Sequence, residues 1–191
     1  MMQPVWHSRS YLPHVDGLSR QQFITFRLAD SLPKSVLQRL AAELPDEDQD
    51  SERHTRIEEF LDSGHGSCLL RDHACAEIVE GALLHFANIR YRLIAWVVMP
   101  NHVHALIEPR SEHLLADILH AWKSFTANKI NRLLGQDGPL WQREYWDRYI
   151  RDMEHLQSTI AYIHANPVAA GLVDDAQRWL FSSAHHIQTE A

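Results

Sequence analysis

The chain has 191 residues, of which 45% are hydrophobic and 23% are charged, and this balance is typical of one folded domain with a substantial core. It excludes disordered and fibrous proteins. No apolar run approaches the roughly 20 residues of a membrane helix, and residues 1–13 lack the apolar centre of a signal peptide, so we expect a cytoplasmic protein. Cys68 and Cys75 are too few for a disulfide framework, and we expect both thiols to be reduced.

The net charge of −7 argues against strong non-specific binding to nucleic acid, whose phosphates usually meet a basic surface. Residues 43–62 hold nine acidic and two basic side chains, so this stretch carries the whole excess, and the remaining chain has 16 of each sign. We expect 43–62 to be a solvated insertion or surface excursion that does not touch a functional site. Residues 120–151 have six bases against three acids, which predicts a modest basic face.

The first predicted strand covers residues 21–27, which are rich in β-branched and aromatic side chains. Helical spacing of apolar residues follows at 34–44 and 55–61, on either side of the most acidic part of the chain. The 68–86 segment repeats apolar residues on one helix face and is expected to be a buried helix.

Residues 91–99 and 102–108 are expected to form a β-hairpin around the Pro100-Asn101 turn. The remaining elements are a helix over 114–134 that ends near Gly135, a strand within 141–150, and a helix over 152–166 halted by Pro167. The resulting order β-α-β-β-α-β-α predicts a ferredoxin-like α+β fold, an antiparallel sheet with helices packed mainly on one face. Residues 1–191 are expected to form a single domain.

His102 and His104 lie two residues apart at the start of the second hairpin strand. Because side chains alternate between the faces of a strand, both imidazoles point to the same side, about 7 Å apart along it, where they could hold one divalent cation. A chain with 14 histidines also produces such a spacing by chance. Seven other histidines show no partner pattern, namely His7, His14, His54, His65, His73, His185 and His186.

The last predicted helix carries a polar stripe in which Tyr162 and Asn166 are one turn apart. A nearby divalent cation would favour the phenolate of a tyrosine, and an amide oxygen is a suitable ligand for Mg²⁺ or Mn²⁺. By spacing alone, an ordinary amphipathic residue at the core boundary is the better explanation of Tyr162.

Three blocks of the sequence resemble the single-tyrosine HUH transposases, and in particular their REP-associated tyrosine transposase group. The blocks are WVVMPNHVHALIEP (96–109), WQREYWDRYIRD (141–152) and YIHANPVAAGLV (162–173). They occur in the family's order, and the resemblance covers about residues 20–185. It implies a ferredoxin-like core and a metal-dependent endonuclease and strand transferase that cleaves single-stranded DNA beside a hairpin through a 5′-phosphotyrosine intermediate.

Carried to this chain, the resemblance implies that Tyr162 is the nucleophile and that His102, His104 and Asn166 hold Mg²⁺ or Mn²⁺. It implies DNA hairpins of the repetitive extragenic palindrome type as partners, with no membrane, and we expect a monomer in preference to a homodimer. The candidates for phosphate contacts are basic residues of the later half, although solvated surface arginine is the more frequent outcome. They are Lys123, Arg143, Arg148 and Arg151.

Two other functions are open at this point. A domesticated DNA-hairpin-binding regulator would keep the fold without catalysis, but the presence of all four site residues disfavours it. A small-molecule metal hydrolase would use the histidine pair and leave Tyr162 incidental. A cleavage assay separates the three, because the regulator would bind a hairpin without cutting it and the hydrolase would form no covalent DNA intermediate.

Overall fold

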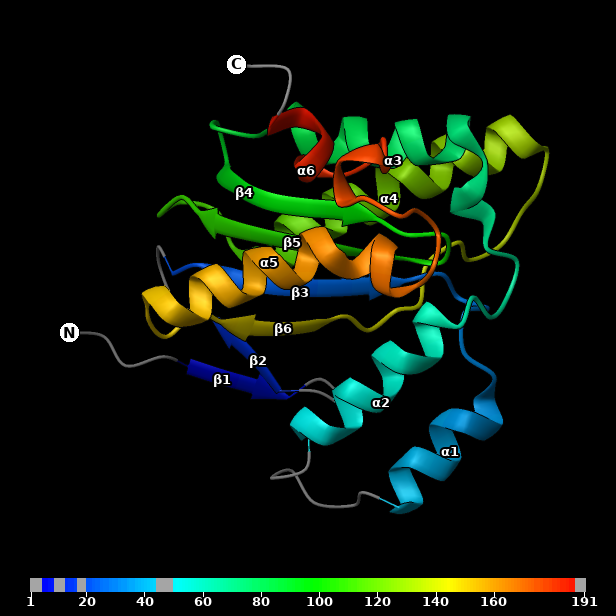
Figure 1. Cartoon of the computed structure of the whole chain (residues 1–191), viewed down its shortest axis with the longest axis horizontal. Helices are drawn as coiled ribbons and strands as arrows, with labels where there is room; N and C mark the ends of the chain where they lie inside the picture. Colours follow the sequence, from blue (N-terminus) through cyan, green and yellow to red (C-terminus); the bar gives the residue numbers. More distant parts are fainter. Residues whose placement is uncertain (1–4, 9–12, 17–19, 44–49, 188–191) are drawn as a thin grey trace.

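A four-stranded antiparallel sheet forms the centre of the computed structural model, which describes residues 5–8, 13–16, 20–43 and 50–187 (Figure 1). The strand order is β4-β5-β3-β6. The strands are β3 (Gln22–Arg27), β4 (Tyr91–Val98), β5 (His102–Pro109) and β6 (Trp146–Tyr149). Helix α3 (His73–His85) connects β3 to β4, and α4 (Leu115–Leu134) connects β5 to β6. This connectivity and strand order confirm the predicted ferredoxin-like α+β fold.

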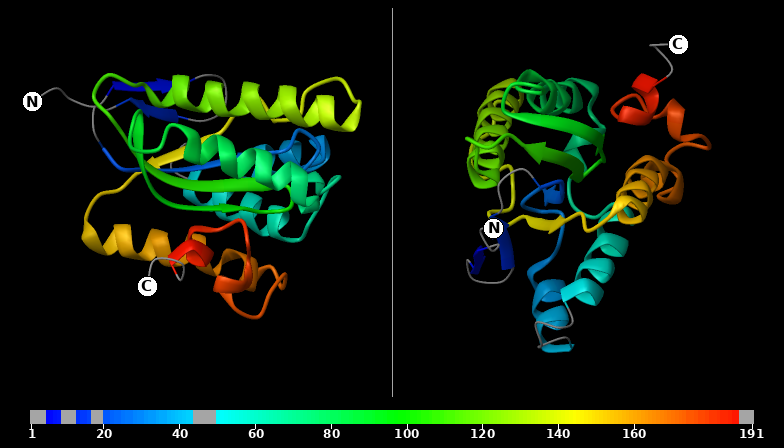
Figure 2. Two further views of the ribbon diagram at one scale, coloured as in Figure 1. Left: turned by 90° about the horizontal axis from the view of Figure 1, so that it is seen from above. Right: turned by 90° about the vertical axis from the view of Figure 1, so that its left-hand side faces the viewer.

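Helices cover both faces of the sheet, as the right-hand view of Figure 2 shows. The connecting helices α3 and α4 pack on one face, as expected, against inward-pointing residues such as Ile24, Phe26 and Val103. Helix α5 (Met153–Ala169) lies against the opposite face, where Ile163 packs with Phe23 and other side chains of the sheet. Successive strand residues therefore serve two separate apolar cores.

The predicted hairpin is present, with β4 and β5 paired in antiparallel register through Val98 and Val103. The amide of Met99 donates to the carbonyl of His102 at 2.9 Å, which closes the turn at Pro100-Asn101. Helix α4 ends at Gly135, whose left-handed backbone (φ 61°) is accessible to glycine without a steric penalty. These local predictions are confirmed.

Several element boundaries differ from the prediction. The helix predicted over 55–61 begins at Asp50, and the helix predicted over 68–86 begins at His73. The strand expected within 141–150 is reduced to Trp146–Tyr149. The expectation that Pro167 ends the last helix is wrong, because α5 continues to Ala169. The φ of proline is compatible with a helix, and its missing amide removes one hydrogen bond of the last turn. The helix can therefore continue for two residues beyond Pro167. The amide of Ala170 still donates to the carbonyl of Asn166 at 2.9 Å.

A short antiparallel pair, β1 (Val5–Ser8) and β2 (Pro13–Asp16), precedes the strand that the sequence predicted to be the first. This pair was not predicted, because neither segment has the run of β-branched and aromatic residues on which the first predicted strand rests. Short 3₁₀ turns lie at Leu69–Arg71 and Ala176–Arg178, and α6 (Ser183–His186) follows the second of them.

Helices α1 (Lys34–Glu43) and α2 (Asp50–Asp62) stand between β3 and α3 and share an apolar cluster of their own. Residues 44–49 of the acidic stretch lie outside the described residues. Both cysteines are free and buried, as expected. Among the helices in the described part of the chain, none combines the length and the hydropathy that crossing a bilayer requires.

Candidate functional site

His102 and His104 lie on the face of the sheet that α5 covers, and both side chains are fully buried (0% exposed). The alternation of β5 puts both rings on this face, as predicted. Their Nε2 atoms converge to 3.0 Å. The Nε2 atoms of the two imidazoles are therefore close enough to contact the same atom.

The tautomer of His102 follows from Asn101 in the preceding turn. The Asn101 amide group donates from Nδ2 to the carbonyls of Leu61 and His65, at 3.1 and 3.0 Å. Its Oδ1 atom then faces His102 Nδ1 at 2.8 Å and accepts a hydrogen bond from it. Because a neutral imidazole has one N–H, we assign a lone pair to His102 Nε2.

Thr25 of β3 fixes His104 in the same way. Thr25 Oγ1 lies 2.9 Å from His104 Nδ1. When His104 donates from Nδ1 to this hydroxyl, it also presents a lone pair at Nε2. Burial lowers the pKa of His104 to about 3 and that of His102 well below its usual range, so no bridging proton is bound at neutral pH. Two lone pairs 3.0 Å apart repel each other unless a cation lies between them.

Helix α5 brings Tyr162 and Asn166 to this histidine pair. Asp152 caps the start of the helix, because its carboxylate accepts from the amide of His155 at 2.8 Å, and the apolar stripe of α5 packs on the sheet. Asn166 is 2% exposed, its Nδ2 lies 3.5 Å from His104 Nε2, and its Oδ1 has no hydrogen-bond partner. Since the two ends of the amide have nearly the same shape, a flipped Asn166 would offer that oxygen to the imidazoles.

Tyr162 places its ring beside the histidines and its hydroxyl in the interior. The ring centroid lies 5.5 Å from that of His104 and 5.9 Å from that of Phe23, and the residue is 38% exposed. The hydroxyl donates to the carboxyl group of Glu58. Burial and the adjacent Glu58 raise the pKa of Tyr162 above its usual value. All four predicted site residues are thus brought together, and their catalytic and metal-binding roles stay predictions.

The acidic stretch also reaches this site, and the expectation that residues 43–62 do not touch it is wrong. Glu58 of α2 is 6% exposed, and its Oε2 lies 3.3 Å from His104 Nε2. Asp62 Oδ1 lies 3.8 Å from His102 Nε2. Burial raises the pKa of Glu58 and, with Glu58 nearby, raises that of Asp62 to about 7.

A sequence signal for these residues exists. His54, Glu58 and Asp62 are spaced by four residues, which places them on one face of a helix. The imidazole of His54 stacks on Trp146 of β6, with ring centroids 3.5 Å apart and planes 8° apart. Burial lowers the pKa of His54 to about 4. The high density of acidic residues concealed this polar stripe, because it pointed to solvation of the whole stretch.

The donor atoms at this site suit a divalent cation. The described residues contain no group of three or more His, Cys, Asp or Glu side chains already arranged as a metal site. However, neighbouring ligands of an octahedral ion with bonds of about 2.1 Å lie roughly 3.0 Å apart, which is the separation of the two Nε2 atoms. The buried oxygen of Asn166, which has no hydrogen-bond partner, is a third candidate ligand of the cation. Two imidazoles and an amide therefore fit the ligand set that was predicted.

Of the four predicted DNA-binding residues, Lys123 is engaged within the fold. Its ammonium group donates to the carbonyls of Gln142 and Arg143, both at 2.7 Å, and burial lowers its pKa to about 8. These contacts hold the segment before β6 and disfavour a phosphate contact by Lys123. Arg143, Arg148 and Arg151 are exposed, and Arg148 pairs across the sheet with Phe23, on the face of the histidine site.

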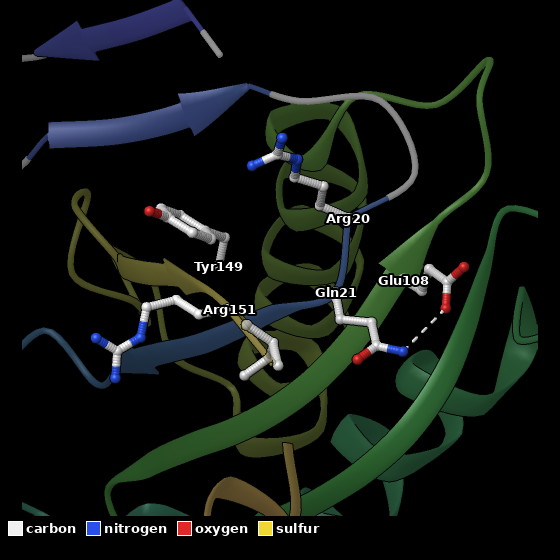
Figure 3. Close-up of a pocket in the computed structure, with 6 residues that line it drawn as sticks. Arg20, Gln21, Glu108, Tyr149 and Arg151 are labelled. Carbon is white, nitrogen blue, oxygen red and sulfur yellow. Dashed lines mark hydrogen bonds between the residues drawn. The ribbon is translucent and has the colours of Figure 1, made fainter. Parts of the chain in front are cut away.

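Arg151 lines a pocket of about 470 Å³ together with Arg20 and Tyr149 (Figure 3). The guanidinium of Arg20 lies 5.7 Å from the centre of the Tyr149 ring, and Gln21 donates to Glu108 at 3.4 Å. Glu108 is near the far end of β5 from His102, about 20 Å along the strand. The pocket is therefore separate from the histidine site.

The family model for IS200-like transposases matches residues 72–166, about half of the chain. This range contains both histidines of the pair, Tyr162 and Asn166. The chain belongs to the IS200-like transposase family. Helices α1 and α2 lie outside the matched range of this transposase family.

Two curated relatives of this chain are REP-associated tyrosine transposases, which confirms the resemblance found in the sequence. A Haemophilus influenzae protein assigned to that group is 29% identical over 106 residues, and the Escherichia coli K12 REP-associated tyrosine transposase is 28% identical over 96 residues. Each alignment covers 50% of this chain, and the two cover 60% and 55% of the relatives. The chain thus spans little more than half the length of the curated relatives it matches.

The fold is similar to that of a REP-associated tyrosine transposase solved with a REP hairpin bound. The TM-score is 0.59 with 18% sequence identity, over 94% of this chain and 83% of the other. At this level of identity, the likeness supports the transposase fold and no finer statement.

Proposed function

We propose that the chain is a metal-dependent single-stranded DNA endonuclease and strand transferase that acts at hairpin-forming repeats. The observation that carries this proposal is the arrangement around His104 in a member of the IS200-like transposase family. The Nε2 atom of His104 lies 3.0 Å from that of His102 and 3.5 Å from the Asn166 amide, and the Tyr162 ring lies beside the His104 ring. A fold neighbour solved with a REP hairpin supports a DNA hairpin as the substrate class.

In the proposed reaction, the Tyr162 oxygen attacks the phosphorus of the scissile phosphodiester. A bond forms between this oxygen and phosphorus as the bond from phosphorus to the 3′ oxygen breaks. Tyr162 loses its hydroxyl proton and the 3′ oxygen takes up one proton, which leaves a free 3′-OH and a 5′-phosphotyrosine. Because the tyrosyl ester retains the energy of the phosphodiester, a DNA 3′-OH can attack it and rejoin strands. Cleavage and strand transfer are then one reversible chemistry that needs no ATP.

The protein mainly positions the reacting groups. His102, His104 and Asn166 would hold the cation, while Asn101 and Thr25 keep the imidazole lone pairs directed to it. When bound, Mg²⁺ or Mn²⁺ would neutralise charge on the phosphate and favour the phenolate of Tyr162. Phe23 packs against the Tyr162 ring and limits its orientation.

The test is cleavage of a single-stranded hairpin oligonucleotide by the whole chain in Mg²⁺ or Mn²⁺, with EDTA as the control. We expect a 3′-labelled oligonucleotide to yield a labelled protein adduct on a denaturing gel, and a 5′-labelled one to yield a shorter fragment ending in 3′-OH. A mobility shift without cleavage would contradict the proposal and indicate a hairpin-binding regulator. Absence of both binding and cleavage would leave no support for either DNA function.

Arg148 is expected to contact the DNA backbone because it is exposed on the site's face of the sheet, beside Trp146. Arg148→Ala should weaken hairpin binding and lower the slope of log K against log salt concentration by about 0.7 to 0.9, the value of one phosphate contact. Fluorescence anisotropy over a salt series measures both quantities. Arg132→Ala is the matched control, since Arg132 is exposed on α4, which covers the opposite face. An equal effect of the two substitutions would refute this placement of the DNA.

A further inference from the structure

Helix α2 brings a carboxyl group against the histidine pair from outside the range that the family model matches. Glu58 Oε2 lies 3.3 Å from His104 Nε2 and accepts from the Tyr162 hydroxyl. The other oxygen, Oε1, is buried and has no hydrogen-bond partner, although His54 Nε2 lies 3.3 Å away. An ionised carboxylate this deeply buried is costly unless positive charge compensates it.

The metal ligands predicted from the sequence are all uncharged side chains. Two imidazoles and an amide carry no charge to balance a divalent cation, whereas Mg²⁺ and Mn²⁺ prefer carboxylate oxygen. Separations of 3.0 and 3.3 Å from His104 Nε2 to His102 Nε2 and to Glu58 Oε2 suit neighbouring ligands of one ion. Asp62, 3.8 Å from His102 Nε2, adds a second carboxyl group at the edge of the site.

The position of Glu58 is built into the fold. Asn101 bonds the carbonyl of Leu61, three residues along α2, and the same amide sets the tautomer of His102. On its other side, α2 packs Leu61 into the apolar cluster with α1. His54, which lies on the same face of α2 as Glu58, stacks on Trp146. Contacts at both ends of the helix thus hold Glu58 in place.

We propose that Glu58 is an additional, anionic ligand of the cation, and that the same carboxyl group holds the Tyr162 hydroxyl when no cation is bound. This inference rests on the proposed function, because it requires the cation site. Cation binding then attracts Glu58 and frees the nucleophile for DNA. Helix α2 thereby couples metal loading to the release of Tyr162.

Mn²⁺ binding to the whole chain without DNA tests this role. Electron paramagnetic resonance follows the loss of the free Mn²⁺ signal, and calorimetry gives Kd. Glu58→Gln keeps the shape of the side chain and removes its charge, and we expect it to weaken Mn²⁺ binding at least about tenfold. Glu59→Gln, at the exposed neighbouring position of α2, is the matched control and should stay within about twofold.

Two further variants separate coordination from a structural role. Glu58→Asp retains the charge and should bind Mn²⁺ more tightly than Glu58→Gln, even where either change lowers stability. Tyr162→Phe removes the competing hydroxyl and should bind Mn²⁺ at least as tightly as the unaltered chain. If Tyr162→Phe binds Mn²⁺ more weakly than the unaltered chain does, the proposal that Glu58 leaves the Tyr162 hydroxyl to bind the cation is overturned.

The outcomes distinguish this inference from the proposed function. If Glu58→Gln binds Mn²⁺ as tightly as the unaltered chain while His102→Ala loses binding, Glu58 is no ligand and the histidine site stands. If the unaltered chain binds no Mn²⁺, or binds it equally well after His102→Ala, both the cation site and the role of Glu58 are overturned.

Discussion

Tyr162→Phe is expected to abolish covalent attachment to a hairpin oligonucleotide and to lower the cleavage rate by about 10⁴-fold or more, because the attacking oxygen is removed. The phenylalanine ring retains the contacts with Phe23 and His104, whose ring centroids lie 5.9 and 5.5 Å from that of Tyr162. Hairpin affinity should therefore change by no more than about twofold. A denaturing gel measures the adduct, and fluorescence anisotropy measures binding.

The control for this experiment is Tyr149→Phe, which removes a hydroxyl from the pocket at the opposite end of the sheet. It should leave the adduct intact. Persistence of the adduct in Tyr162→Phe, together with its loss in Tyr149→Phe, would assign the nucleophile to the other pocket and reject the histidine site.

Loss of one imidazole is expected to have the second largest effect. His102→Ala should weaken Mn²⁺ binding by at least about 100-fold, since replacing even the outer partners of metal ligands costs 10- to 100-fold. DNA cleavage should fall with it, while hairpin binding through the exposed arginines is largely retained. Calorimetry and the cleavage assay measure the two losses separately.

Because His102 is fully buried, its removal also tests folding. Ligand linkage supplies a readout that misfolding cannot mimic: Mn²⁺ should raise the thermal midpoint of the unaltered chain and leave that of a folded His102→Ala unchanged. His120→Ala, at an exposed position of α4, is the control and should keep the Mn²⁺ shift. An Mn²⁺ shift of full size in His102→Ala would rule out this imidazole as a ligand.

Local periodicity made much of the fold predictable. The hairpin around Pro100-Asn101 and the helix ending at Gly135 both follow from backbone preferences of nearby residues. The end of α5 was misplaced at Pro167, because the cost of proline in a helix depends on which hydrogen bonds it removes.

The same periodicities made the central site predictable. A period of two put His102 and His104 on one side of β5, and a period of 3.6 put Tyr162 and Asn166 on one side of α5. The residue types, together with the resemblance to the single-tyrosine HUH transposases, then indicated that the two pairs form one site. Their proximity, with the two Nε2 atoms 3.0 Å apart, is a property of the packed structure.

The part of the site that escaped prediction comes from α2. Acidic residues near Glu58 were interpreted as a solvated face, because composition averages over a stretch and does not reveal which side of a helix is buried. Lys123 was likewise assigned to DNA by its charge, although its ammonium group bonds two carbonyls of the same chain.

By itself, the sequence determined the order of strands and helices from β3 to α5, the resemblance to the family, and the two pairs of residues that each face one side of their element. Only the tertiary structure decided that α2 docks on this site and brings Glu58 to Tyr162, 104 residues away along the chain. The physical reason is that side-chain direction follows from local backbone geometry, whereas the meeting of two distant faces depends on packing. Here that packing joins Leu61 to the α1 cluster and His54 to Trp146.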